Sequence, residues 1–262
     1  MLGGQRAWSI GVIPPRNARR SRACVSWLTG ILCLGGCAEV MTTQERLVAC
    51  ANPILGVDRA IAACTAILQG GGETRDGLVR VLQYRGVAYF VRHQPDRAFA
   101  DYDEAIRLDP ANAGTFVARG LHHHREGHPG LALRDHDEAV RLTPREGGFL
   151  MRRGDLHARQ DHPGPAREDY GNAIRIEPGN ARFLLGRADF EAGRGHFAAA
   201  IPDYDAAILL GAGPLSHLAF HGRGKAYRSL GQTDRAEADA ARAAELDPRR
   251  GEPPHGPPPP SR

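Results

Sequence analysis

The apolar positions of this chain recur with a period of 34 residues through about two thirds of its length. One series of alanines marks the period, with two extra residues near Gly211 before the last member: Ala98, Ala132, Ala166, Ala200 and Ala236. A second series follows at the same interval: Ala105, Ala139, Ala173, Ala207 and Ala243. A fixed period of this length indicates stacked repeats, in which each unit buries its apolar face against its neighbours.

Two charged positions follow the same period. The first half of each unit contains an arginine, at Arg85, Arg119, Arg153, Arg187 and Arg223. The second half contains an aspartate, at Asp101, Asp135, Asp169, Asp203 and Asp239. Because a catalytic site is singular and this pair occurs five times, we interpret it as an internal ion-pair ladder that sets the register of two antiparallel helices.

Prolines end most of the units, in Leu-Asp-Pro110, Leu-Thr-Pro144, Ile-Glu-Pro178 and Leu-Asp-Pro248. Proline cannot continue a helix, so each of these motifs predicts a turn. Together the period, the small residues and the prolines resemble the tetratricopeptide repeat, a family of 34-residue helix-turn-helix units. The resemblance divides residues 79–250 into five repeats, at 79–112, 113–146, 147–180, 181–214 and 217–250. It implies an all-α, right-handed superhelical solenoid whose first helices line a concave groove that binds protein or peptide partners.

The groove residues follow from the face of each first helix opposite the small packing residues. We expect this face to be largely apolar in the first two repeats and charged in the later ones. The predicted groove residues are Gln83, Tyr84, Val87, Phe90, Val117, Leu121, His124, Arg125, Arg152, Asp155 and Arg159. Family members that bind a carboxy-terminal carboxylate need Asn and Lys where this chain has Val87 and Gln83, so that activity is not implied.

The amino terminus is typical of an export signal. Arginines cluster between Arg16 and Arg22, an uncharged apolar segment follows, and that segment ends in Leu34-Gly35-Gly36-Cys37. These four residues resemble the lipobox of bacterial lipoproteins, which implies cleavage after residue 36 and lipidation of Cys37. Ala38 at the next position favours the outer membrane by the same resemblance. A plain cleaved signal, with a soluble periplasmic or secreted product, and a chain that is not exported remain the alternatives.

Two further cysteines, Cys50 and Cys64, remain between the leader and the repeats. They lie in two apolar-patterned stretches separated by a Pro/Gly turn, and an antiparallel helix pair brings such stretches together. We therefore expect either one disulfide between them, in a half-repeat that caps the solenoid within residues 37–78, or two buried free thiols.

Charge and motifs exclude two classes of function. The formal net charge of +4 falls to −1 when the five arginines of residues 1–36 are removed, so nothing favours nucleic acid as a partner. The chain contains no G-x-S-x-G, P-loop or H-E-x-x-H motif. The sequence therefore predicts a non-enzymatic adaptor without a cofactor. The proline-rich segment 251–262 is predicted to be a disordered tail.

Histidine is the one unusual ingredient. Seven of the twelve histidines lie in two repeats: His122, His123, His124, His128, His136, His157 and His162. His123, His136 and His157 occupy positions at which other repeats have tyrosine, which favours a packing role and predicts no metal site. A protein that binds zinc or nickel through this cluster is the alternative from a different class.

Overall fold

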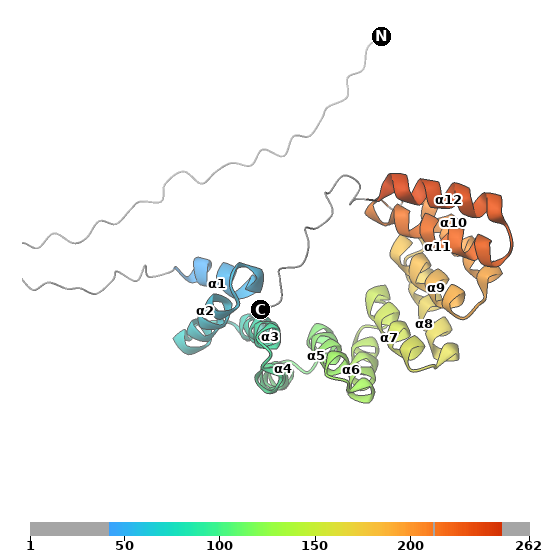
Figure 1. Cartoon of the computed structure of the whole chain (residues 1–262). Coiled ribbons are helices and arrows are strands. Elements are labelled where there is room, and N and C mark those ends of the chain that lie inside the picture. Colours follow the sequence, from blue (N-terminus) through green and yellow to red (C-terminus); the bar gives the residue numbers. More distant parts are fainter. Residues whose placement is uncertain (1–41, 212, 248–262) are drawn as a thin grey trace, which may run out of the picture. The chain divides into compact units, whose positions relative to one another are not determined.

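The computed structural model describes residues 42–211 and 213–247 as a series of helices (Figure 1). The predicted leader, Cys37 and the tail at 251–262 lie outside these residues. The α-helices described are α1 (Thr43–Ala51), α2 (Val57–Gly70), α3 (Arg75–Val91), α4 (Pro95–Leu108), α5 (Ala113–Arg125), α6 (Pro129–Leu142), α7 (Gly147–Arg159), α8 (Pro163–Ile176), α9 (Ala181–Gly193), α10 (Phe197–Leu209), α11 (Ser216–Ser229) and α12 (Thr233–Leu246). Short 3₁₀ turns, η1 (Pro53–Leu55) and η2 (Gly213–Leu215), precede α2 and α11.

Consecutive helices pack against each other in chain order, which confirms the predicted all-α solenoid of helix-turn-helix units. Contacts also link the first helices of neighbouring units, as between α3 and α5, α7 and α9, and α9 and α11. Within the two described ranges, no helix has the length and apolar character that crossing a bilayer requires.

The first helix of the first repeat extends ahead of the expected repeat boundary at residue 79. Helix α3 starts at Arg75, where the Thr74 side chain accepts a hydrogen bond from the Gly77 backbone N–H and caps the helix. The segment before it is also more regular than a half-repeat, because α1 and α2 form a helix pair of their own. The solenoid therefore begins with a complete but shortened hairpin.

The turn inside each repeat has the same local structure. A residue in the left-handed region, with φ between 55° and 80°, stands at His93, Gly127, Asp161, Gly195 and Gly231. The backbone N–H of the next residue donates to a carbonyl of the preceding helix at 2.8–2.9 Å. Three of the second helices then start with proline, whose fixed φ suits the first helical position.

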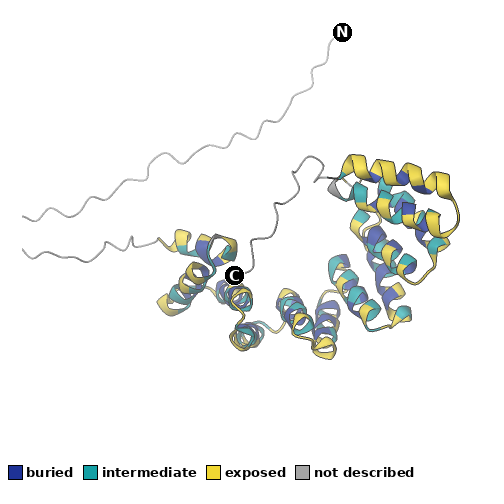
Figure 2. Ribbon diagram, viewed as in Figure 1, coloured by how far each residue is buried: buried dark blue, intermediate teal, exposed yellow. Residues whose placement is uncertain are grey.

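Close approach of the two helices depends on glycine and alanine. A Cβ at Gly86 would lie 2.9 Å from the Tyr102 ring, and one at Gly120 would lie 2.6 Å from His136 Nδ1. Tyr102 and His136 are fully buried at equivalent positions of successive repeats, so the histidine fills the space that tyrosine fills elsewhere. Figure 2 shows the buried positions along the faces where helices meet.

The predicted ion-pair ladder is confirmed in all five repeats. Each arginine donates two hydrogen bonds, from Nε and Nη2, to the two carboxylate oxygens of its aspartate at 2.6–3.0 Å. The aspartate side chains are only 2–10% exposed. This planar, two-bond arrangement fixes the height of one helix against the other.

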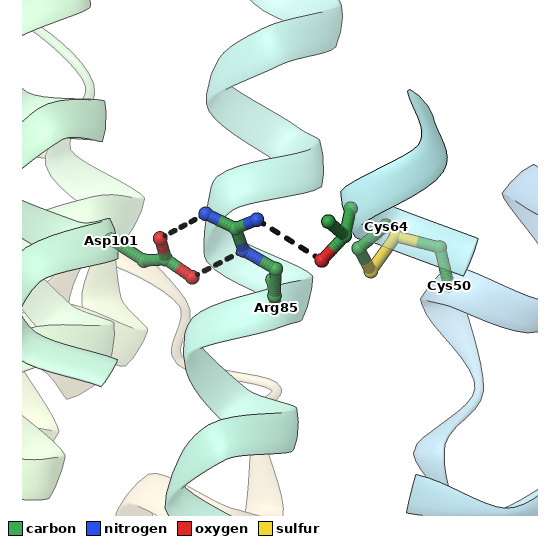
Figure 3. Close-up of a disulfide and its surroundings, with 5 residues drawn as sticks. Cys50, Cys64, Arg85 and Asp101 are labelled. Atoms are coloured by element: carbon green, nitrogen blue, oxygen red, sulfur yellow. Dashed lines mark hydrogen bonds and ion pairs between the residues drawn. A yellow bond between two sulfur atoms is a disulfide. The ribbon is translucent and has the colours of Figure 1, made fainter. Parts of the chain in front are cut away.

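The ladder also joins one repeat to the next through the remaining arginine nitrogen. Nη1 of Arg119, Arg153 and Arg223 lies 2.6–3.1 Å from a carboxylate of the preceding repeat, at Asp103, Asp137 and Asp205 respectively. Arg85 Nη1 instead donates to the Thr65 hydroxyl of α2 at 3.1 Å, which ties the first repeat to the amino-terminal hairpin (Figure 3).

The amino-terminal hairpin is held by a disulfide between Cys50 of α1 and Cys64 of α2 (Figure 3). Both cysteines are fully buried and pack with Ala63, Ile67 and Val81. The sequence leaves open a disulfide or two free thiols, and the structure contains the disulfide. A cross-link across a loop of this length contributes about 3 kcal/mol, which is large for a short hairpin at one end of a solenoid.

The ladder has one incomplete rung, and this gives a stability test. Gly171 of α8 occupies the position of Asp103, Asp137 and Asp205, so Arg187 lacks an acceptor there. Open space surrounds the Gly171 Cα. We predict that Gly171→Asp is more stable than Gly171→Asn by about 0.5–1 kcal/mol in urea unfolding at low salt, because the two residues have similar helix propensity and only aspartate supplies the missing charge.

The difference should shrink in 1 M NaCl, which screens a half-exposed ion pair. An aspartate variant no more stable than the asparagine variant at low salt would show that the inter-repeat rung does not stabilise the stack.

Candidate functional site

A cleft of about 570 Å³ lies between the first helices of the third and fourth repeats, α7 and α9. Tyr170 of α8 contributes to its wall as well. Charged and apolar side chains line it together: Met151, Asp155, Arg159, Asp189, Phe190 and Arg194. The cleft therefore lies on the first-helix face, where the sequence analysis placed a partner-binding groove.

Two tyrosine–aspartate hydrogen bonds fix the acidic side chains of the cleft. The Tyr170 hydroxyl donates to Asp155 Oδ1 at 2.6 Å, and the Tyr204 hydroxyl donates to Asp189 Oδ1 at 2.6 Å. Burial raises the pKa of Asp155, and the hydrogen bond from Tyr170 opposes this shift. Each carboxylate keeps acceptor capacity after accepting one hydrogen bond, so both can bind a further donor.

Most of the nearby cations already have partners. Arg194 Nη1 lies 2.8 Å from Asp161 Oδ1, and its guanidinium lies 6.0 Å from the centre of the Phe190 ring. Arg167 of α8 donates two hydrogen bonds to Glu191 of α9, which replaces the missing rung at Gly171 as a link between the third and fourth repeats. These bonds, together with one that Glu191 accepts from His196 Nδ1, lower the pKa of Glu191 to about 2.

In the first two repeats the predicted groove is filled by the protein's own side chains. The Phe90 ring packs edge-on against His122, with ring centres 3.8 Å apart, and the Arg125 guanidinium covers it at 5.8 Å. Leu121 is half-buried against the core formed by Ala113, Phe116 and Ala139. Phe90 and Leu121 therefore form part of the packing between and within repeats.

Two more predicted groove residues are committed to contacts inside the protein. Val117 is only 8% exposed and belongs to the core of the second repeat, where it lies in one cluster with Phe116 and Ala139. Gln83 donates to Asn112 Oδ1 at 3.3 Å and to the Thr115 hydroxyl at 2.6 Å. Its amide group joins the first repeat to the start of α5 and is committed to this internal contact.

The other predicted residues remain at the surface or half-buried. Tyr84 is 38% exposed and lines a hollow of about 280 Å³ beside α1. Arg125, Arg152 and Arg159 are exposed, whereas Val87, His124 and Asp155 are half-buried. Of the eleven residues, the structure brings Asp155 and Arg159 together in the cleft.

Sequence reasoning missed Tyr170, Phe190 and Arg194 as cleft residues. The sequence contained a signal for Tyr170, because Asp155 and Asp189 replace the apolar Val87 and Leu121 of the earlier repeats. In the third and fourth repeats, a tyrosine of the second helix follows the aspartate by 15 residues. A buried tyrosine hydroxyl needs a partner, and an acid at the apolar position supplies one.

The histidine-rich second repeat is a packing variant of the others. His123 stacks on Phe99 with ring centres 4.3 Å apart, and His136 Nδ1 lies 2.9 Å from the Ala132 carbonyl. Burial lowers the pKa of His123, His136 and His157. Among the described residues, no group of three or more His, Cys, Asp or Glu side chains is placed to hold a metal ion.

Family models for the tetratricopeptide repeat match residues 79–112, 152–217 and 218–250, which together span about half of the chain. The chain belongs to the tetratricopeptide repeat proteins. The matches leave out residues 113–151, which include the whole of the histidine-rich second repeat, although α5 and α6 form the same hairpin there. A search of curated proteins finds no match.

Solved structures with this fold share little sequence with the chain. BtubC from P. vanneervenii is 14% identical with a TM-score of 0.65, covering 82% of this chain and 96% of its own. A tetratricopeptide repeat protein from Parabacteroides merdae is 18% identical with a TM-score of 0.62, covering 78% and 80%. YrrB, described as having an unusual peptide-binding site, is 18% identical with a TM-score of 0.54, covering 72% and 94%. At this identity the likeness concerns the fold.

The buried His122 predicts a loss of stability in acid. This residue is 6% exposed, and its Nε2 lies 3.3 Å from the Tyr102 hydroxyl. Burial, with smaller contributions from Arg125 and His123, lowers its pKa to about 4. Between pH 6.5 and 4 the unfolded chain therefore binds a proton that the folded chain does not, and stability falls as the pH falls.

We expect His122→Leu, which introduces the residue found at the equivalent Leu156, to remove about 1–2 kcal/mol of this pH dependence. Urea unfolding at pH 7.5 and pH 4.5 measures it, with the exposed His128→Gln as the matched control. Equal pH dependence in wild type and His122→Leu would contradict the account.

Proposed function

We propose that this protein is a non-enzymatic adaptor that binds an extended peptide segment of a partner protein on its first-helix face. The observation that carries the proposal is the cleft between α7 and α9, where charged and apolar side chains meet in a hollow of about 570 Å³. A mixture of this kind suits a peptide, which presents polar backbone groups and alternating side chains.

The contacts that build the scaffold recur in every repeat and do not explain the residues of the cleft, which supports a binding role for these residues. The Arg–Asp pairs and the glycine and alanine contacts are repeated from unit to unit. Asp155, Asp189 and Phe190 lie outside this repeated set. A peptide-binding site has been described for YrrB, which has a similar fold, and this supports the same class of ligand here.

We also propose that the protein works at the bacterial cell envelope, anchored through lipid on Cys37. The lipobox-like Leu34-Gly35-Gly36-Cys37 and the preceding arginines support this location. The Cys50–Cys64 disulfide adds independent support, since disulfides persist in the oxidising periplasm and are rare in the cytosol. The outer membrane is favoured by Ala38, and a soluble periplasmic protein is the alternative.

Peptide binding can be measured without a known partner. The full chain is immobilised and used to select dodecapeptides from a random display library, and the affinities of selected peptides are then measured by fluorescence anisotropy. We expect Phe190→Ala to weaken these peptides about tenfold, because truncating a central aromatic anchor commonly costs 1 kcal/mol or more.

Phe220→Ala is the matched control, since Phe220 is also a half-buried first-helix residue with an arginine over its ring but lies outside the cleft. Circular dichroism should show both variants to be folded. Selection of no peptide, or equal weakening by the two variants, would reject the cleft as the binding site.

The anchor has a separate test. Expressed in a Gram-negative host, the protein should fractionate with membranes and carry the mass of a diacylglyceryl group. Cys37→Ser should remove both the added mass and the membrane association, whereas Cys24→Ser, in the leader, should change neither. Unchanged fractionation and mass in Cys37→Ser would refute the lipid anchor and leave the peptide-binding proposal intact.

A further inference from the structure

The two acidic residues of the cleft, Asp155 and Asp189, occur at one place in the solenoid. The position of Asp155 and Asp189 is apolar in the first two repeats, as Val87 and Leu121, and basic in the fifth, as Lys225. Only the third and fourth repeats therefore place a carboxylate there, and α7 and α9 are in contact. The structure of the repeat does not require an acid at this position.

The two carboxylates are held ready for a ligand. The Tyr170 and Tyr204 hydroxyls each donate one hydrogen bond, from the second helix of the same repeat. Tyr170 and the two aspartates line the same cleft. The side chain of Asp189 is exposed, and both acids line the cleft, so their unused acceptor positions are accessible from it.

The protein itself neutralises this pair only in part. Arg194 is engaged by Asp161, Arg167 by Glu191 and Arg187 by Asp203. Arg159, one helical turn after Asp155, and Arg152 act on Asp155 from a distance. Despite them, burial keeps the pKa of Asp155 raised, which means that the carboxylate has lost more from desolvation than it has regained from these charges.

The cleft has a volume of about 570 Å³, which leaves room for a long side chain to reach these acids. A Cβ at Gly186 would lie 3.0 Å from Met151 Cε and 3.6 Å from the Tyr170 ring. The glycine therefore lets Met151 and Tyr170 pack closely against the α9 backbone at the wall of the cleft. Met151 offers a flexible apolar surface for an aliphatic stem.

We infer that the cleft between α7 and α9 receives a basic side chain, arginine or lysine, of the bound peptide, with Asp155 and Asp189 as its two carboxylate partners. The inference rests on the proposed peptide-binding function and specifies the chemistry of its ligand. A guanidinium or ammonium group supplies the donors and the positive charge that these two acids lack, and its stem lies along Met151.

The test uses the peptides selected on the full-length wild-type chain. We expect arginine or lysine to be enriched at one position. Replacing that residue by citrulline, which keeps the shape of arginine without its charge, or by norleucine in the case of lysine, should weaken binding to wild type at least tenfold. This measurement needs no protein variant, so it is independent of any effect of substitution on folding.

The protein side is tested with Asp155→Asn combined with Asp189→Asn. Asparagine keeps an oxygen that accepts the tyrosine hydrogen bond and removes only the charge. This double variant should bind the basic peptide at least tenfold more weakly than wild type and should not distinguish it from the neutral peptide. The matched control removes two exposed carboxylates outside the cleft, by Glu168→Gln with Glu237→Gln, and should bind as wild type does.

Three results would overturn the inference: selected peptides without an enriched basic residue, wild-type binding that is unchanged with the neutral peptide, or equal weakening by the asparagine and glutamine double variants. Each of these leaves peptide binding itself intact. Selection of no peptide at all would instead refute the proposed function, and this inference with it.

Discussion

The buried arginine–aspartate pair within each repeat is the interaction on which the rest of this solenoid depends. Two antiparallel helices that touch through glycine and alanine can slide along each other, because small apolar contacts are similar at several registers. A planar guanidinium that makes two hydrogen bonds to one carboxylate has a single good geometry. An aspartate that is 2–10% exposed is costly to leave unpaired, so registers that break the pair are disfavoured.

The same arginine carries the register from one repeat to the next. In three repeats its third nitrogen reaches a carboxylate of the preceding unit, and in the first it reaches Thr65 of the disulfide-linked hairpin. The rung is incomplete where Gly171 replaces aspartate. There Arg167 and Glu191 form a different link, and the cleft between α7 and α9 lies at the same junction. The chain thus departs from its repeating pattern at the place where its candidate site is found.

Much of this architecture could be predicted from the sequence because it is repeated. Five copies of Arg85 and Asp101 at one spacing identify a structural pair, and small residues at Gly86 and Ala98 identify the helix contact. The start of helix α3 at Arg75 could not be predicted from the period, because it depends on a local cap at Thr74. Val117 was misplaced because assigning a helix face from spacing does not say how far each helix is rotated against its partner.

The site was harder to predict than the fold for a physical reason. The spacing along the sequence assigns Phe90 to the groove face of its helix, but the His122 and Arg125 side chains cover it in the structure. Tyr170 reaches the cleft from a second helix, although the groove was expected on first helices alone. Such contacts depend on which side chain fills a gap left by another. They differ from one repeat to the next, so the period of the sequence does not predict them.

The most direct test of the ladder is a double-mutant cycle on Arg187 and Asp203, measured by urea unfolding. Arg187 is suited to it because no third acceptor in the described chain occupies its Nη1. With Arg187→Gln and Asp203→Asn, we expect a coupling energy of about 1–3 kcal/mol, and a clearly smaller coupling energy for the exposed Arg107–Glu104 pair treated in the same way. Equal coupling energies in the two cycles would contradict the claim that the buried pairs hold the repeats in register.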